Sequence, residues 1–335
     1  MGKLSSAITA VLLVGTLAVT AGYSFYLNHQ KSKEGQRVLK LGHNLPTAHP
    51  VHKAMVLMQA RLKEISGGNL TLDIHPSSVL GSETQCIEML QNGTLAMTKT
   101  SAAAMENFIP SMSVFSLPYV FRDGEHYWLV LEGEVGKELL EKGETVGLRG
   151  LCYYDGGSRN FYSKTKPIQT PDDLKGMKIR VMTSATAMEM IKSMGGAPTP
   201  IPFNDLYSAL AQGVVDGAEN NPPSFVSNKH YEVCKYFSLD GHTRVPDVLM
   251  MSKIVWNKLS PQEQEWVQQA ADESSLFQRE LWQKEMVAAL ESAKENGVTI
   301  YEVDTALFAE KVKPMLEQIE DEQVKALLDR IEQVE

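Results

Sequence analysis

GMKIRVMTSATAMEMIKSMGGAPTPIPFNDLYSALAQGVVDGAENNPPS, residues 176–224, predicts a strand, two helices and a second strand. The first strand runs from Lys178 to Val181, with Ile179 and Val181 on one face and Arg180 on the other. An arginine that alternates with core residues needs water, an acid or a ligand as its partner. Arg180 is therefore the first candidate for a functional side chain.

The two helices of this stretch have clear start and stop signals. Thr183 or Ser184 can cap the first helix, and a glycine pair that begins at Gly195 ends it. Asn204 can cap the second helix, which ends at Gly213. Two strand ends should therefore converge across a pair of helices.

Polar side chains follow the second strand, which we expect at Val214–Ala218. This strand closes on Glu219, Asn220 and Asn221 before a pair of prolines breaks the pattern. A guanidinium grips a carboxylate with two parallel bonds, and a carboxamide offers a donor and an acceptor to hydroxyls. Arg180 and Asn220 therefore suit a small anion. The alternative is that Arg180 pairs with a structural acid and that the asparagines cap a turn.

Length and composition are those of an ordinary globular chain. Its 335 residues are 43% hydrophobic and 22% charged, and this length predicts two lobes rather than one core. The net charge of −9 argues against a nucleic-acid partner, because binding phosphates requires a basic surface. Local basic side chains can still bind an acidic small molecule.

Residues 1–30 predict an export segment. After Lys3 no Asp, Glu, Lys or Arg occurs before Lys31, and an apolar run extends from Ile8 to Val19. Small residues allow a signal peptidase to cleave after Ala21. The uncharged span is also long enough to cross a bilayer, so an uncleaved membrane anchor is the alternative. Both interpretations predict that the rest of the chain is exported.

Strands and helices alternate at the start of the exported part. Strands are expected at Arg37–His43, Leu70–His75 and Leu95–Thr98, separated by helices at 51–66 and 82–92. This βαβαβ order predicts parallel strands joined by crossover helices, a fold of the α/β class. Binding loops of such sheets lie at the carboxyl ends of the strands.

His43, His49, Glu83 and Lys99 fall on or beside such loops or strand ends. Each is a candidate for ligand contact, and for each the alternative is a solvated or structural group. His49 and His52 are three residues apart, but no third ligand at a suitable spacing lies nearby. We therefore expect no metal site.

A strand at Gly147–Asp155 leads into a Gly156-Gly157 turn and then to Arg159. Glycine tolerates unusual backbone angles, which suits a chain that crosses between lobes. Arg159 thus becomes a second candidate for binding an anion. Upstream of this strand, the pattern predicts a single helix at Glu125–Glu141.

The sequence contains none of the common catalytic or nucleotide-binding motifs. GxSxG, the Walker loop and HExxH are absent, as is a GxGxxG followed by an acidic residue. Cys86, Cys152 and Cys234 are far apart and odd in number, and we interpret them as small buried apolar residues. No cofactor is expected.

The C-terminal region reads as mostly helical. Ser260 can cap a helix with Pro261 at its first position, and helical patterning continues to about Asn296. A helix of this length fits a rod that spans both lobes. A strand at Val298–Val303 and two short helices should complete the chain.

Four ordered motifs give the sequence a specific resemblance. GGSRNFYS, GMKIRV, GAPTPIPFNDLYSALAQGVVDGAEN and LSPQEQE resemble the substrate-binding proteins of TRAP transporters, the DctP type, and the similarity extends from about Val38 to about Gln318. The resemblance implies a periplasmic α/β binding protein with two lobes, a hinge and a long helix across both lobes. Lobe I would comprise residues 38–157 with about 247–285, and lobe II residues 158–246 with about 286–335.

The resemblance also implies roles for individual residues. In this family an arginine that matches Arg180 forms a bidentate salt bridge with the ligand carboxylate. Arg159 and Asn220 match two further binding positions. Asn221, together with SRNFYS and the histidines of GHNLPTAHPVHKAM, resembles the subgroup that binds sugar acids, particularly hexuronates such as glucuronate and galacturonate. Hydroxyls of such a ligand need donors and acceptors, which Glu83, Asn220, Asn221 and His43 can supply.

The implied function is capture of an organic acid by closure of a cleft, followed by delivery to the TRAP membrane subunits, without catalysis. One alternative is a different acid, such as an aldonate, a keto acid or a dicarboxylate. A second alternative, from another class, is an exported sugar-acid enzyme that uses Glu83 and a histidine as an acid/base pair.

Overall fold

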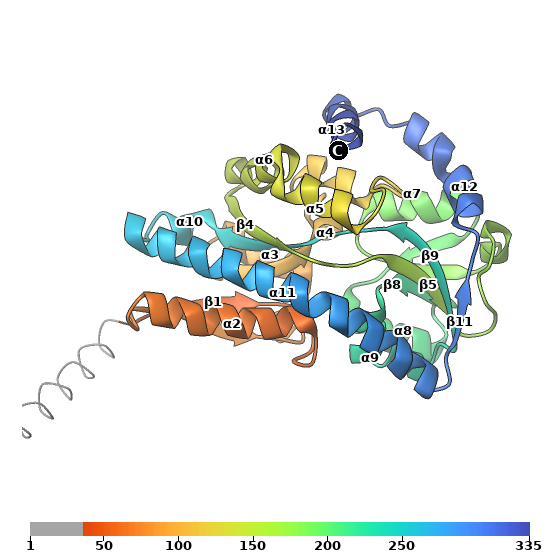
Figure 1. The fold of residues 1–335 in the computed structure, drawn as a ribbon, viewed down its shortest axis with the longest axis horizontal. Coiled ribbons are helices and arrows are strands. Elements are labelled where there is room, and N and C mark those ends of the chain that lie inside the picture. The colour runs from red at the N-terminus through yellow and green to blue at the C-terminus, as the bar shows by residue number, and fades with distance from the viewer. Residues whose placement is uncertain (1–35) are drawn as a thin grey trace, which may run out of the picture.

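The computed structural model describes residues 36–335. The predicted signal peptide or anchor, residues 1–30, and its cleavage point after Ala21 lie outside these residues. Within residues 36–335, no helix is both long and apolar enough to cross a membrane. Two β-sheets form the centres of two lobes, and helix α11 runs along both (Figure 1).

The first sheet combines parallel and antiparallel strands. Its strands in spatial order are β2 (Leu70–His75), β1 (Arg37–Gly42), β3 (Met97–Ser101), β10 (Asp247–Ser252) and β4 (Leu148–Tyr154). The strands β1, β2 and β3 are parallel and are joined by α2 (Pro50–Ile65) and α3 (Glu83–Gln91), which confirms the predicted βαβαβ unit. β10 returns late in the sequence and pairs antiparallel with both β3 and β4.

The second sheet contains the strands of residues 176–224. Its strands in spatial order are β11 (Thr299–Glu302), β9 (Tyr236–Thr243), β5 (Arg159–Ser163), β8 (Gly217–Asn220), β6 (Lys178–Val181) and β7 (Ala197–Pro200). The bounds predicted for β6 are confirmed. The bounds predicted for β8 were wrong, because the strand begins at Gly217 instead of Val214. β7 was not predicted, since its two prolines disguise an edge strand.

Helix starts in the second lobe differ in two places from the prediction. α7 (Ala185–Ser193) is capped by Ser184, as expected. The predicted cap of the next helix at Asn204 was wrong: Asn204 lies in a 3₁₀ turn, and α8 (Leu206–Gln212) starts after Asp205. The proline pair after Asn221 does not break the chain but begins helix α9 (Pro222–Ser227), because proline lacks the N–H that a first turn leaves unpaired.

The helix predicted at Glu125–Glu141 is two helices. α5 (Gly124–Glu132) and α6 (Glu134–Lys142) meet at Gly133, whose backbone is extended. The remaining shorter elements are α4 (Ala102–Met105), α10 (Lys253–Trp256) and the 3₁₀ helices at Pro110–Ser116, Gly143–Val146, Pro171–Leu174, Phe203–Asp205 and His230–Glu232.

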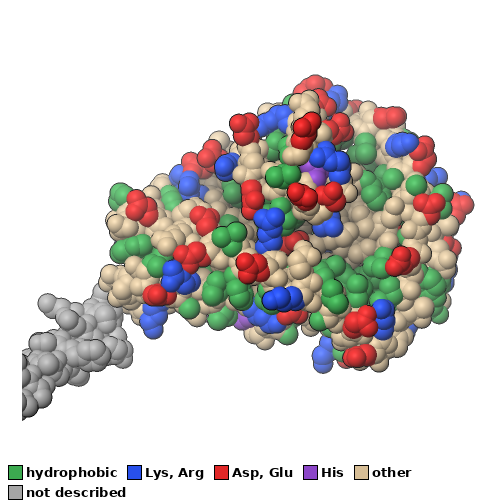
Figure 2. All heavy atoms as spheres, in the orientation of Figure 1, with side chains coloured by type: hydrophobic (Ala, Val, Ile, Leu, Met, Phe, Trp, Pro, Cys, Tyr) green, Lys and Arg blue, Asp and Glu red, His purple; other side chains and the backbone are tan. Residues whose placement is uncertain are grey.

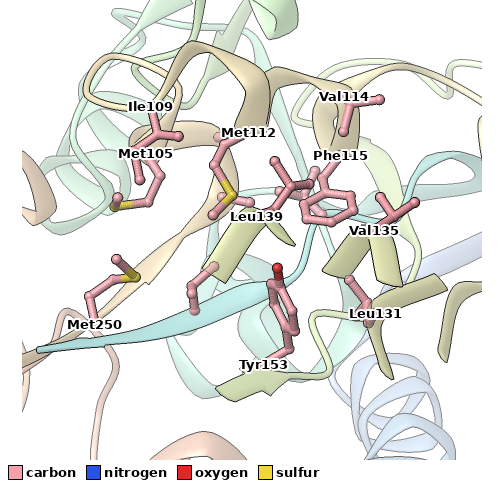
Figure 3. Packing of buried hydrophobic residues seen from close by; sticks show 14 of the residues in the cluster. Met105, Ile109, Met112, Val114, Phe115, Leu131, Val135, Leu139, Tyr153 and Met250 are labelled. Atoms are coloured by element: carbon pink, nitrogen blue, oxygen red, sulfur yellow. The ribbon is translucent and has the colours of Figure 1, made fainter. Parts of the chain in front are cut away.

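One hydrophobic core of the first lobe lies between its sheet and the helices above it. Phe115 and Leu139 from helical segments pack toward Tyr153 and Met250 from the strands (Figure 3). The hydroxyl of Tyr153 donates to the carbonyl of Gly136 at 2.8 Å, so even its polar end is satisfied. All three cysteines are buried and free, as their interpretation as apolar residues predicted.

The last two helices attach to different lobes. α12 (Thr305–Glu317) packs on α7, and β11 extends the second sheet. α13 (Glu322–Glu332) instead inserts Val324, Leu327 and Ile331 into the core of the first lobe. The expectation that all of residues 286–335 complete the second lobe was therefore wrong for α13, because its apolar face fits the first lobe's core.

The long helix α11 (Pro261–Glu295) ties the lobes together. Ser260 and Glu263 form a reciprocal capping box at its start. The helix packs on α2 and β4 in the first lobe and on α9 in the second, as the sequence predicted for a rod across both lobes. Its Trp282 lies against the crossing point at Gly157, where φ is +59° and a Cβ would come within 2.8 Å of the indole nitrogen. Position 157 therefore requires glycine, both because φ is positive and because there is no room for a Cβ.

On the face drawn in Figure 2, acidic and basic side chains are interspersed rather than gathered into one area. A small number of charged side chains are buried, among them Lys99, Arg159, Arg180 and Glu219.

Candidate ligand-binding site

A cavity between the lobes is lined by residues from both sheets. Six of the eight predicted site residues line it: Glu83, Lys99, Arg159, Arg180, Asn220 and Asn221. His43 and His49, which also lie in the described part of the chain, are not among its lining residues. Sequence reasoning missed four polar lining residues, Asn44, Ser101, Ser224 and Asp247.

Arg180 presents an unpaired guanidinium to this cavity. It projects from β6 and is only 2% exposed. Its Nε donates to the carbonyl of Ile201 at 2.8 Å, but Nη1 has no hydrogen-bond partner. Within residues 36–335 it forms no ion pair, and burial lowers its pKa. A buried cation without a counter-ion is unfavourable, so an anion that enters the cavity gains a strong partner.

Arg159, in contrast, already has an acid partner. Its Nε and Nη2 both bond the carboxylate of Glu219, and Nη2 also donates to the Glu219 carbonyl at 2.8 Å. Its Nη1 donates to Oδ1 of Asn220 at 3.0 Å. Burial opposes the charge of Arg159, but Glu219 raises its pKa above the ordinary value. Arg159 therefore orients Asn220, and the carboxylate of Glu219 offsets the positive charge of Arg159.

Behind Glu219 lies a buried charge network that the sequence analysis did not find. His242 bonds Asp240 through Nδ1 at 2.6 Å and Glu219 through Nε2 at 3.4 Å, and its ring stacks on Phe161. Burial opposes its protonation, but the two carboxylates raise the pKa of His242 to about 9. In turn, Arg159 and His242 hold the pKa of Glu219 at about 2 despite burial. The network fixes Glu219 as an ionised carboxylate.

Asn220 and Asn221 make different hydrogen bonds. Asn221 Oδ1 accepts from the backbone N–H of Ser224 at 2.8 Å and so caps α9, which fits the capping alternative. Its Nδ2 donates to the carbonyl of Gly156 at 2.7 Å, at the crossing between lobes. Asn220 uses Oδ1 to accept from Arg159 and from the Asn221 N–H. Its Nδ2 makes no hydrogen bond to any residue in the described range and can donate to a ligand.

The first-lobe wall of the cavity contains an ion triplet. Lys99 Nζ lies 2.9 Å from Asp247 and 3.6 Å from Glu83, and its side chain is 3% exposed. Glu83 also accepts from the backbone N–H of Ser101 at 2.8 Å. Burial opposes the charge on Lys99, but the two acids raise its pKa. All three side chains are thereby fixed on the wall.

The histidines near the cavity are neutral structural groups. Burial, followed by the charge of Lys99, lowers the pKa of His43 to about 3, and the same two causes lower that of His49. His43 accepts from the Leu45 N–H at 3.2 Å. His49 caps α2 and bonds the Ser224 hydroxyl at 3.2 Å, so it positions a residue that lines the cavity.

Comparison with known proteins identifies the family. The model of the DctP family, bacterial extracellular solute-binding protein family 7, matches residues 41–323. The chain belongs to this family. The resemblance read from the four motifs is thereby confirmed, and with it the two-lobe α/β fold.

Solved structures of TRAP periplasmic solute-binding proteins resemble this DctP-family chain over most of its length. One from Xanthobacter autotrophicus with bound β-D-galacturonate is 35% identical, covers 89% of this chain and 100% of its own, and has a TM-score of 0.86. One from Citrobacter koseri with bound D-glucuronate is 36% identical, with coverages of 90% and 100% and a TM-score of 0.86. One from Polaromonas with D-erythronate is 32% identical, with coverages of 90% and 99% and a TM-score of 0.87.

The His242 network predicts a pH-dependent stability for this DctP-family protein. Because the folded-state pKa of about 9 lies above the ordinary value of 6.5, the stabilisation is full below pH 6.5 and is lost as pH rises through 9. It amounts to at most about 3 kcal/mol. Urea unfolding from pH 6 to pH 9.5 should show this decline in the wild type and a flatter profile in His242→Gln. His75→Gln, outside the network, is the control, and equal slopes in all three proteins would contradict the assignment.

Proposed function

We propose that this protein captures a hexuronate, such as glucuronate or galacturonate, between its two lobes and delivers it to the membrane subunits of a TRAP transporter. The observation that carries the proposal is the free Nη1 of buried Arg180 in a cavity lined by carboxamides, hydroxyls and carboxylates. The hexuronates bound by the Xanthobacter and Citrobacter relatives support the choice of ligand.

Different residues of the cavity can bind the two ends of such a ligand. Arg180 binds the carboxylate with a charge-assisted, two-pronged contact. Asn220, Ser101 and Ser224 can meet hydroxyls, and Glu83 adds an acceptor. A sugar hydroxyl missing from an analogue leaves one of these groups buried and unpaired, which penalises the analogue strongly.

Closure of the lobes provides capture. The ligand contacts both walls of the cavity only when the lobes are together, so binding shifts the population toward the closed state. Gly156 and Gly157 lie where the chain crosses between the lobes, and α11 continues from one lobe to the other. The proposed lobe boundary at 157/158 lies at the glycine pair, and the one at 246/247 lies between β9 and β10, which belong to different sheets.

A second candidate ligand is an aldonate, because the Polaromonas relative holds D-erythronate. An enzymatic role is disfavoured at the level of the family, whose members are solute-binding proteins. The acid/base pair that an enzyme would need is also poorly placed, since His43 and His49 do not line the cavity with Glu83.

A thermal-shift screen of sugar acids should give its largest stabilisation with a hexuronate, and the hexuronate should be recovered unchanged after long incubation. Ligand binding to the folded state raises stability in proportion to the logarithm of ligand concentration over Kd. Stabilisation by C4-dicarboxylates or amino acids alone would reject the hexuronate assignment, and chemical conversion would reject the absence of catalysis.

Arg180→Met should weaken hexuronate binding in calorimetry at least about 100-fold, because loss of a buried charge partner costs about 3–5 kcal/mol. Arg180→Lys should recover only part of the affinity, since an ammonium cannot make the two-pronged contact. Thermal melting of the ligand-free Met variant should be no lower than wild type, because an unpaired buried cation has been removed. Lys178→Ala, an exposed position on the same strand, is the control and should bind normally. Near-wild-type affinity of Arg180→Met would reject Arg180 as the carboxylate ligand.

Mass spectrometry of the protein recovered from an expressing bacterium should find an N-terminus at or close to Gly22, as cleavage after Ala21 gives. A chain beginning at Met1 and recovered with the membrane would instead identify an anchor.

A further inference from the structure

We infer that the cavity selects acids with one carboxylate and excludes diacids, because its first-lobe wall carries two carboxylates, Glu83 and Asp247, that share one lysine. The inference rests on the proposed function and deepens it. It concerns the end of the ligand that lies away from Arg180 and assigns Asp247 a role in specificity.

The first-lobe wall has a net negative charge. Glu83 and Asp247 are two carboxylates with the single ammonium of Lys99 between them. Burial raises the pKa of Asp247, but the Lys99 ammonium 2.9 Å away favours its ionised form. Lys99 is held on β3 inside the lobe, with its side chain 3% exposed, while both acids remain 15% exposed at the cavity. The surface that a ligand meets is therefore carboxylate rather than ammonium.

Lys99 is not available to a second ligand carboxylate. Moving its ammonium toward the ligand would leave two half-buried acids without their counter-ion, which is unfavourable in a site with little water. Within residues 36–335, the second-lobe wall offers no other cation that is free of an acid partner. Arg159 is bonded by Glu219 on two of its nitrogens, and among the described residues that line the cavity Arg180 is the one cation without a carboxylate partner.

Charge across the cavity is thus arranged for one anionic group. Glu83 and Asp247 line the same cavity as Arg180 and Arg159. A monoacid places its carboxylate on Arg180 and turns hydroxyls toward Glu83 and Asp247, which accept hydrogen bonds. A diacid that places one carboxylate on Arg180 brings the other against two like charges in a site with little water, where repulsion is weakly screened.

Two pairs of acids isolate this effect, since the members of each pair differ in the oxidation state of one terminal carbon. D-glucarate is D-glucuronate with C1 oxidised to a carboxylate, and meso-tartrate is D-erythronate with C4 oxidised to a carboxylate. Calorimetry of the ligand-stripped wild-type protein at pH 7.5 should give a monoacid affinity at least about 100-fold above that of its diacid, because like-charge contacts cost several kcal/mol.

Variants locate the origin of the discrimination. Asp247→Asn and Glu83→Gln each remove one negative charge from the wall and should lower the ratio of glucuronate to glucarate affinity about tenfold. Glucuronate forms a ring, whereas glucarate is an open chain. This difference affects the affinity ratio equally in every variant, so a change in the ratio from one protein to another reports the substitution. Glu88→Gln, an exposed position on the same helix as Glu83, removes an equal charge and should leave the ratio unchanged.

The outcomes separate this inference from the proposed function. Equal binding of monoacid and diacid by the wild type overturns the inference and leaves the hexuronate proposal standing. A ratio that neither Asp247→Asn nor Glu83→Gln changes overturns the role of these carboxylates. Binding of erythronate but not glucuronate, with tartrate excluded, supports the inference and rejects the hexuronate. The wild-type comparison needs no substitution and holds even where a variant fails to fold.

Discussion

A buried guanidinium without a counter-ion is the constraint on which this structure depends. Arg180 is 2% exposed and its Nη1 has no hydrogen-bond partner. Holding a cation in that state is unfavourable, so the surrounding fold must supply the stability that keeps it there. The β6 strand does so by placing Ile179 and Val181 in the apolar core while Arg180 faces the cavity. The alternation of side chains along β6 therefore packs the core of the lobe and also places the arginine in the cavity.

The other two cations of the cavity have acid partners before any ligand arrives. Glu219 bonds Arg159 and is itself held by His242, and Lys99 lies between two acids on the opposite wall. Each network links segments that are far apart in the sequence, so correct pairing requires both sheets to be complete. The cavity thus presents a single cation without an acid partner, opposite a wall of net negative charge, and that cation makes the site selective for an anion.

Much of this architecture could be predicted from the sequence, because alternation and capping are local signals. β6 and β2 have the predicted bounds, and Arg180 stood out by its place in the alternation. The prediction failed where tertiary contacts decide: the valines before Gly217 look like a strand but precede it, and α13 joins the first lobe through its packing. Asp247 and His242 were missed because their partners come from strands distant in sequence, and no spacing rule reports such pairs.

The electrostatics also explain why two lobes serve this task better than one preformed pocket. A site that held Arg180 and the acids of the opposite wall in permanent contact would pair them with each other and lose the anion. Separate sheets joined at Gly157 and along α11 keep the two walls on different bodies, each with its own internal ion pairs. The ligand then supplies the one charge that Arg180 lacks and the hydroxyls that the acidic wall can accept. Closure is favourable only when the ligand brings a carboxylate to Arg180 and hydroxyls to the acidic wall. The contacts that stabilise the closed state are therefore the same contacts that select the ligand.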